Sequence, residues 1–329
     1  MVTIQPIGDN LNHCCVIGGN GFIGSYLVPL LIASGRIVTV VDRAPFSTIN
    51  LIENMRYVQA DYNDEKFLLR ILIDVDEVID LAYATVPKTS FDDPVNDILT
   101  NLPPMVKLLE VACSIGLNKV VLVSSGGTVY GRAQELPLKE DHPTNPISPY
   151  GITKLAIEKY AFMYHELKSL PVLCVRPGNA YGARQRPFSG QGFVATAIAS
   201  ILQRKVLNLF GPTGTIRDYI HVEDIANGIL AALQYGKTGS CYNIGTGIGM
   251  SNKDILDALL PAATSAGFDI SVSILPPRNF DVPVNILDST KLKNETGWEP
   301  KVAFEEGIKK TWEWYFEAGL AQKNGAKIR

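Results

Sequence analysis

The sequence predicts an α/β fold with a doubly wound parallel sheet and a smaller, interleaved C-terminal domain. In the first half of the chain, short and almost continuously apolar runs alternate with longer helical patterns. Parallel strands that helices cover on both faces have this pattern. After Arg176 the alternation gives way to Gly and Pro clusters, which indicates a second lobe, and 329 residues suffice for about two such units.

Six apolar runs are the expected strands of the sheet. Ligands of such a sheet bind beyond the carboxyl ends of the strands, so the residues that follow each run are the first candidates for a site. The segment Tyr219–Leu233 has the pattern of a strand and a helix that return to the first lobe. We therefore expect a first domain over residues 1–177 together with 218–245, and a second domain over 178–217 and 246–329. The expected strands are His13–Ile17, Ile37–Val41, Tyr57–Ala60, Glu77–Ala82, Val120–Ser124 and Val172–Val175.

Charge and composition exclude several classes of protein. Thirty basic and 33 acidic residues give a net charge of −3, so no overall positive field attracts nucleic acid or an anionic membrane. No apolar run approaches the ~18 residues of a membrane span. The N-terminus lacks the pattern of a secretory signal, so we expect a cytoplasmic protein with no membrane partner. The five cysteines have no metal-ligand spacing, and no metal is expected.

A glycine-rich loop follows the first predicted strand. Its glycines at positions 18, 21 and 24 let the chain turn tightly and approach a pyrophosphate, before a helix over Ser25–Ser34 whose N-terminus favours anions. Without a ligand, the same loop would be only a tight strand-to-helix turn. Asp42 closes the next strand at the spacing expected of an acid that binds ribose hydroxyls. This context favours a dinucleotide, and NAD over NADP, although the neighbouring Arg43 could tolerate a 2′-phosphate.

A tyrosine and a lysine are predicted on one face of a later helix. Ser148 has the position of an N-cap and Pro149 that of the first helical residue, so Tyr150 and Lys154 lie one turn apart. A tyrosine with a pKa near 10 is a poor base at neutral pH. The Lys154 ammonium and a nicotinium ring would each favour the phenolate. Taken alone, the pair would more often be a chance feature of a surface helix, but after a dinucleotide loop it predicts an acid–base centre.

The order and spacing of several motifs resemble the extended short-chain dehydrogenase/reductase family, in which the cofactor domain is a Rossmann fold. Within that family the sequence is most similar to NAD-dependent nucleotide-sugar epimerases of the UDP-glucose 4-epimerase type. The motifs are Gly18-x-x-Gly21-x-x-Gly24, Asp61-Tyr62, the run SSGGTVYG at 124–131, Tyr150-x-x-x-Lys154, RPGNAYG at 176–182, RDYIHV at 217–222 and Arg278-x-x-Asp281-Val282-Pro283.

The resemblance implies that the first domain binds NAD. Asp61 would contact the adenine, Asn101 would support the nicotinamide side, and Lys154 would hold the nicotinamide ribose. The expected cofactor-binding residues are Gly18, Gly21, Phe22, Ile23, Gly24, Asp42, Arg43, Asp61, Tyr62, Leu81, Ala82, Asn101, Ser124, Tyr150, Lys154 and Pro177.

The resemblance also implies that the second domain binds a nucleotide sugar. Asn179, Arg217 and Arg278 would hold its diphosphate, since arginine offers bidentate contacts to phosphate. Arg217 could instead form a structural ion pair with Asp218 or Glu223. The expected substrate-binding residues are Ser125, Gly126, Tyr150, Asn179, Arg217, Arg278, Asp281 and Asn285.

The chain departs from the family pattern in the serine run. Gly126 occupies the third position, which usually carries the catalytic hydroxyl, so Ser125, and after it Thr128, is expected to reach the sugar O4. Asn285 stands where the resemblance implies a bulky tyrosine in glucose-specific enzymes. Its smaller side chain can offer an amide hydrogen bond, which predicts that UDP-N-acetylglucosamine is accepted, with or without UDP-glucose.

The implied reaction is C4 epimerisation of a nucleotide sugar through a transient 4-keto sugar. Tyr150 would take the O4 proton while NAD takes hydride from C4 and later returns it to the other face. Other NAD-dependent nucleotide-sugar enzymes, namely a decarboxylase, a reductase or a dehydratase, are alternatives. A dehydratase would carry an Asp-Glu pair where Gly127 and Thr128 stand. A non-catalytic dinucleotide-binding sensor is a second alternative, but it would not need Tyr150 and Lys154 together with the two arginines.

Two predicted helices also indicate a partner. The segments Val95–Ser114 and Tyr150–Leu167 carry apolar residues on more than one face. Family members commonly dimerise through these helices, so the resemblance implies a homodimer with twofold symmetry.

Overall fold

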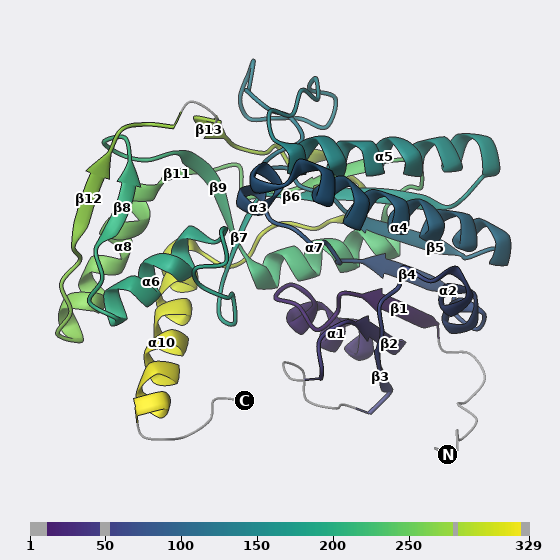
Figure 1. Ribbon diagram of the computed structural model, residues 1–329, viewed down its shortest axis with the longest axis horizontal. Coiled ribbons are helices and arrows are strands. Elements are labelled where there is room, and N and C mark those ends of the chain that lie inside the picture. The colour runs from purple at the N-terminus through teal and green to yellow at the C-terminus, as the bar shows by residue number, and fades with distance from the viewer. Residues whose placement is uncertain (1–11, 47–52, 279–281, 324–329) are drawn as a thin grey trace.

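The computed structural model describes residues 12–46, 53–278 and 282–323, which form two lobes (Figure 1). The first lobe is built on a parallel sheet of seven strands in the order β10-β6-β5-β4-β1-β2-β3. This arrangement confirms the predicted doubly wound parallel sheet. The strands are β1 (His13–Ile17), β2 (Ile37–Asp42), β3 (Met55–Gln59), β4 (Glu77–Asp80), β5 (Lys119–Val123), β6 (Val172–Pro177) and β10 (Cys241–Ile244).

Helices cover both faces of this sheet because successive strand residues point to opposite sides. Cys14 and Val16 of β1 pack in one apolar core with residues of α1 (Gly24–Ala33), α7 (Val222–Tyr235) and α9 (Thr290–Thr296). Cys15 and Ile17 pack in a second core on the opposite face. That face is covered by α2 (Glu65–Leu72), α4 (Pro94–Ile115) and α5 (Pro149–Lys168), with the short α3 (Pro87–Asp92) beside them.

Helix α4 is the one described helix that is long and apolar enough, by length and composition, to cross a membrane. It packs against α2 and α5, and Asp97 and Asn101 are among its buried residues. These two polar side chains point into the site described below, as expected of a core helix in an α/β domain.

Within the described ranges, the second lobe contains a four-stranded sheet, a two-stranded sheet and three helices. The larger sheet combines β7 (Asn179–Tyr181), β9 (Ile216–His221), β11 (Gly249–Ser251) and β13 (Val284–Asn285), and the smaller one pairs β8 (Leu207–Phe210) with β12 (Val272–Leu275). A third apolar core joins α6 (Phe193–Leu202), α8 (Asn252–Ser265) and α10 (Phe304–Lys323).

The two lobes are interleaved within the residues 218–245. The strand β9 lies in the sheet of the second lobe, whereas α7 packs on α1 and β10 forms the edge of the first sheet. The chain therefore crosses back to the first lobe where β9 meets α7, and it returns there again with α9, which packs on α7. His221, the last residue of β9, is buried, and its ring accepts a hydrogen bond from Glu223 N as the N-cap of α7.

Strand β4 is shorter than predicted. It ends at Asp80 and not at Ala82, because the Asp80 carboxylate accepts a hydrogen bond from Ala82 N at 3.2 Å. An aspartate that binds the backbone two residues ahead turns the chain out of the strand. This turn directs the following residues towards the glycine-rich loop.

Candidate active site

The carboxyl ends of β1, β2, β3 and β4 surround a cavity of about 200 Å³. Nine of the predicted cofactor-binding residues line it, namely Gly18, Gly21, Asp42, Arg43, Asp61, Tyr62, Leu81, Ala82 and Asn101. Its other lining residues were not predicted from the sequence, namely Ile17, Val41, Ala60, Asn63, Tyr83, Ala84 and Thr100. Most of these residues could have been predicted, because they directly adjoin a predicted residue in the sequence. The predicted residues Phe22, Ile23, Gly24, Ser124, Tyr150, Lys154 and Pro177 are not part of this lining.

The glycine-rich loop leaves no room for side chains. Gly18 has φ +76°, and a Cβ there would lie 2.8 Å from Ala82 N and 2.9 Å from Ala82 Cα. Gly24 opens α1, and a Cβ there would clash with the backbone of Gly19. It therefore serves helix packing and does not line the cavity. The backbone of the loop is thus free to approach a ligand, as expected from the sequence.

Asp42 ends β2 at the wall of the cavity. Its two carboxylate oxygens accept hydrogen bonds from Asn20 N at 3.2 Å and Ala44 N at 3.0 Å. These bonds fix the carboxylate at the position that the sequence pattern predicts for a ribose-binding acid.

Tyr150 and Lys154 lie one turn apart on α5, in the arrangement predicted from their spacing. Ser148 is the N-cap of that helix and accepts a hydrogen bond from Gly151 N at 3.1 Å. The Tyr150 ring meets the Tyr83 ring edge-on with centroids 4.7 Å apart. Lys154 Nζ lies 4.2 Å from the Tyr83 centroid and 6.0 Å from that of Tyr150. It donates a hydrogen bond to Val123 O at 2.7 Å, and so ties α5 to the end of β5.

The predicted lowering of the Tyr150 pKa by Lys154 is not found in the protein alone. Burial raises the pKa of Tyr150 above its ordinary value, Asp97 raises it further, and a hydrogen bond with the Ser125 hydroxyl lowers it. Burial also lowers the pKa of Lys154 to about 8, against the opposing effect of Asp80. The lysine is itself buried and bound to a carbonyl, so phenolate formation needs an additional positive charge beside the ring.

Asp80 and Lys154 are a buried pair of opposite charges. Burial raises the pKa of Asp80 to about 7, although Lys154 and the bond from Ala82 N act to lower it. Desolvation therefore outweighs the attraction between the two groups.

Asp97 is a second buried carboxylate beside Tyr150, and it was not predicted from the sequence. Its carboxylate accepts hydrogen bonds from Thr153 Oγ1 at 2.6 Å and from Thr85 Oγ1, and its backbone oxygen accepts one from Asn101 Nδ2 at 2.7 Å. These bonds tie α4 to α5 and to the segment after β4. Its position four residues before the predicted Asn101, on the same face of the helix, was the signal that could have identified it.

The serine run lies at the end of β5, next to Tyr150. Ser125 is the member of the run whose hydroxyl is close enough to the Tyr150 phenol to lower its pKa. The hydroxyls of Ser124 and Thr128 are buried and have no hydrogen-bond partner among the described residues. The first of the two expected hydroxyls, Ser125, is thus placed at the tyrosine, while Thr128 is not seen to contact it.

The replacement of the usual third hydroxyl by Gly126 has a steric cause. A Cβ at this position would lie 2.5 Å from Leu287 Cδ1 and 2.8 Å from Arg176 O. The Leu287 side chain is fully buried and the second contact is backbone, so neither can easily move aside. A serine at position 126 would not fit this structure.

The sheet of the second lobe gathers three predicted substrate-binding residues. Asn179 lies on β7, and Arg217 on β9 is the direct register partner of Asn285 on β13. Arg217 Nη1 donates to Ile216 O at 2.8 Å. The Asp218 carboxylate, which was the possible partner of Arg217, accepts hydrogen bonds from the backbone N atoms of Thr246, Gly247 and Leu287.

The motif Arg278-x-x-Asp281 contributes two predicted substrate-binding residues, and the structure describes only the first of them. Arg278 is exposed after β12, with its guanidinium carbon 4.1 Å from the centroid of the Phe210 ring. Arg278 therefore lies beside the two-stranded sheet of β8 and β12, whereas Arg217 lies on the four-stranded sheet. Asp281 lies outside the described residues.

Asn285 is buried beside the serine run. Its side chain is 1% exposed, and its Nδ2 donates a hydrogen bond to Gly126 O at 2.9 Å. One of the two N–H groups of the amide is therefore bound within the protein.

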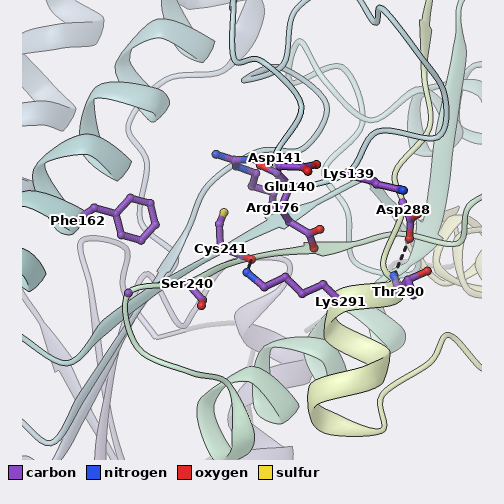
Figure 2. Close-up of a pocket in the computed structure, with 11 residues that line it drawn as sticks. Lys139, Glu140, Asp141, Phe162, Arg176, Ser240, Cys241, Asp288, Thr290 and Lys291 are labelled. Atoms are coloured by element: carbon purple, nitrogen blue, oxygen red, sulfur yellow. Dashed lines mark hydrogen bonds between the residues drawn. The ribbon is translucent and has the colours of Figure 1, made fainter.

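A larger cavity of about 840 Å³ lies beside β10 and the start of α9 (Figure 2). None of the predicted site residues lines it. Its charged residues are three bases and three acids, and the Arg176 guanidinium is paired with Glu158 at 2.6 Å. This balance gives no net field for a charged ligand.

Several known proteins are similar to this chain over most of its length. The family described as GDP-mannose 4,6 dehydratase matches residues 15–311. A UDP-glucose 4-epimerase of Mycolicibacterium smegmatis is 36% identical over 307 residues, which cover 91% of this chain and 97% of that protein.

Two solved structures extend the similarity to the whole fold. The UDP-glucose 4-epimerase of Thermus thermophilus in complex with NAD matches with a TM-score of 0.86 at 34% identity, over 93% of this chain and 99% of that one. The UDP-N-acetylglucosamine 4-epimerase of Methanobrevibacter ruminantium M1, in complex with UDP-N-acetylmuramic acid, matches with a TM-score of 0.86 at 28% identity over the same shares. The chain therefore belongs to the GDP-mannose 4,6 dehydratase family, within the extended short-chain dehydrogenases/reductases that its motifs predicted.

Proposed function

We propose that this chain is an NAD-dependent nucleotide-sugar 4-epimerase that inverts C4 of a UDP-hexose. The observation that carries the proposal is the grouping of Tyr150 with Lys154 and Tyr83 at the ends of four parallel strands. Lys154 Nζ lies 6.0 Å from the centroid of the Tyr150 ring, and the Tyr83 ring, which meets that of Tyr150 edge-on, lines the cavity. A tyrosine that exchanges a proton with a sugar hydroxyl must be held in place beside the cofactor in this way.

The residues around the cavity fit NAD. Gly18 brings backbone close to the cavity where a Cβ would be excluded, and Asp42 stands fixed at its wall. Its carboxylate would accept bonds from the adenine ribose and repel a 2′-phosphate, which supports NAD over NADP. The buried, unpartnered hydroxyl of Ser124 gives the site a further polar group for a ligand.

The residues of the centre have separate roles in this reaction. When bound, NAD accepts a hydride from the sugar carbon and returns it, so no net redox change occurs. Tyr150 takes the proton of O4 and later gives it back, and Ser125 holds O4 by hydrogen bonding. Lys154 is anchored on Val123 O and contributes a positive charge. Because burial and Asp97 raise the pKa of Tyr150 in the protein alone, its phenolate would need the positive charge of a bound nicotinium ring in addition to that of Lys154.

Dehydration, although it gives the family its description, is the less favoured reaction. Elimination of water needs an acid and a base beside the sugar, and the positions after Gly126 hold Gly127 and Thr128. A reductase would release its cofactor at each turnover, and a non-catalytic sensor would leave Tyr150 and Ser125 without a role.

The proposed substrates are UDP-N-acetylglucosamine and UDP-glucose with their C4 epimers. The relative from Methanobrevibacter ruminantium supports the first and the relative from Mycolicibacterium smegmatis supports the second. The modest size of Asn285 is compatible with both sugars. One N–H of its amide is bound to Gly126 O, so the proposed substrates do not depend on an amide contact to the sugar.

A cytoplasmic homodimer is the proposed form of the enzyme. Apolar side chains are exposed on α4 and α5, which lie side by side on the outside of the first lobe (Figure 1). They include Val95, Leu99, Ile152, Met163 and Leu167. A twofold interface would bury this patch, and light scattering of the purified protein at micromolar concentration would show the mass of two chains.

The function is tested with purified protein and no added cofactor. UDP-glucose, UDP-N-acetylglucosamine and the corresponding dTDP- and GDP-sugars are incubated with it, and the configuration at C4 is followed by proton NMR. Inversion at C4 without release of NADH is the expected result. Release of a 4-keto-6-deoxy sugar would instead assign a dehydratase, and absence of conversion in the whole panel would contradict the proposal. Conversion of UDP-glucose alone would refute the part that concerns the acetylated sugar.

A further inference from the structure

Two consecutive glycines follow the serine that contacts Tyr150. Gly126 and Gly127 have no side chains to restrict the backbone, so the chain next to Ser125 needs support from elsewhere. Gly126 N donates to Pro177 O at 2.9 Å, which fixes one side of the residue to the end of β6. Gly126 O accepts a hydrogen bond from Asn285 Nδ2 at 2.9 Å, which fixes the other side.

The supporting side chains come from the second lobe. Asn285 and Leu287 are two residues apart on an extended segment, and both reach Gly126, one by its amide and the other by its methyl groups. That segment is itself anchored, because Leu287 N donates to the Asp218 carboxylate and Leu138 N donates to Ile286 O. The contacts of Asn285 and Leu287 with Gly126 are therefore themselves held in place by hydrogen bonds. Asn285 lies 159 residues from Gly126 in the sequence.

The orientation of the Asn285 amide follows from its partner. Gly126 O is an acceptor, so the NH₂ group must face it and Oδ1 must point away. Oδ1 is buried and has no hydrogen-bond partner among the described residues, in a side chain that is 1% exposed. An orphaned buried oxygen costs more than one neutral hydrogen bond returns. Stability alone does not account for an asparagine at this position.

We propose that Asn285 is a positioning residue, which holds the Gly126 carbonyl and thereby keeps the adjoining Ser125 hydroxyl beside Tyr150. Asn285 acts through the serine loop of the other lobe and is not part of the cofactor cavity lining. The inference rests on the proposed function, because it assigns Asn285 a part in that reaction.

The test is a double-mutant cycle between Asn285 and Ser125. N285D keeps the shape of the side chain but sets an oxygen against Gly126 O, and N285L removes both polar ends without burying a charge. We expect each to lower kcat about 30-fold, the scale of a small misplacement of a reacting group, with KM changed less than about threefold. In the S125A background the same substitutions should change kcat by less than about threefold, because the group that Asn285 positions is gone.

Asn243 provides the matched control. It is also buried, and its Nδ2 donates to the backbone oxygens of Leu138 and Asp288. Its Oδ1 accepts from Tyr130 Oη, near the far end of the run 124–131, and none of these bonds involves Ser125 or Gly126. N243D places a carboxylate against those carbonyls, so any loss of kcat that it causes should be equal with Ser125 and with S125A.

The outcomes separate this inference from the function on which it rests. If the unmodified enzyme converts no nucleotide sugar, both fail. If it does convert one but the losses in N285D and N285L are equal in the two backgrounds, only the inference fails, and Asn285 is purely structural. A change in KM alone would make Asn285 a substrate-binding residue, and unfolding of both variants would assign it to stability, so each result overturns the inference.

Discussion

The two lobes build their shares of the site in different ways. In the first lobe, the residues that line the cofactor cavity all lie between positions 17 and 101, and most directly follow a strand. In the second lobe, Asn179, Arg217 and Asn285 come from β7, β9 and β13, and only the pairing of these strands brings them together. A site made from strand ends is specified locally, whereas a site made from paired segments depends on the whole tertiary structure. Substitutions in the first region should therefore act locally on the cofactor site, whereas substitutions in the second should act through the packing of distant segments.

The largest effect is expected where the two regions meet, at Tyr150. Tyr150→Phe removes the group that exchanges the O4 proton, so kcat should fall at least about 10³-fold. The cofactor cavity does not depend on the phenol, so the purified variant should retain its NAD, measured by absorbance after denaturation. A variant with more than a tenth of the normal rate would show that another group carries the proton.

The cofactor region is tested at Gly18, where the effect should be local. Gly18→Ala places a Cβ against the backbone of Ala82 and should weaken NAD binding about 100-fold. Gly116 has a similar φ of +71° and nothing within 4 Å of the added atom, so Gly116→Ala carries the backbone strain without the clash. Equal NAD affinities of the two variants, measured by isothermal titration, would remove the argument that the loop must approach a ligand.

The contact between the lobes is tested at Gly126. Gly126→Ser restores the hydroxyl that the family usually carries, yet its Cβ meets Leu287 and Arg176 O. We expect a loss of about 2 kcal/mol in the free energy of unfolding, and lower activity. Adding Leu287→Ala removes the side-chain clash but not the backbone one, so it should recover little of the loss. A serine variant that is as stable as the unmodified protein and more active would contradict this packing of Leu287 and Arg176 on the turn.

The smallest effect concerns charge buried wholly within the first lobe. The folded-state pKa of Asp80, about 7, is above the ordinary value of an aspartate, so the folded protein binds an extra proton between about pH 4 and pH 7. The stability that depends on this proton is present at low pH and is lost as the pH rises through 7. Asp80→Asn should remove this loss, which amounts to about 1 kcal/mol for each pH unit within that range. The free energy of unfolding of both proteins is measured by urea titration at about pH 5 and pH 6.5. If it changes by the same amount between these two pH values in both proteins, the raised pKa of Asp80 is contradicted.

Much of the fold and of the first lobe could be predicted from the sequence. The parallel sheet follows from apolar runs between helical patterns, and nine of the predicted cofactor residues line one cavity because strand ends meet at one edge of such a sheet. Tyr150 and Lys154 share a face because residues four apart on a helix always do. The pKa of Tyr150 could not be predicted in the same way, since it depends on Asp97 and on burial, which no local pattern reveals.

The sequence by itself determined the phosphate loop, the sheet and the spacing of tyrosine and lysine, because these depend on backbone geometry over a few residues. Only the tertiary structure decided that Ser125 reaches the tyrosine, that Leu287 excludes a side chain at Gly126, and that Asn285 holds the Gly126 carbonyl. The bond from Asn285 to Gly126 joins residues 159 positions apart. Such contacts depend on how two lobes pack together, which no periodicity in the chain records.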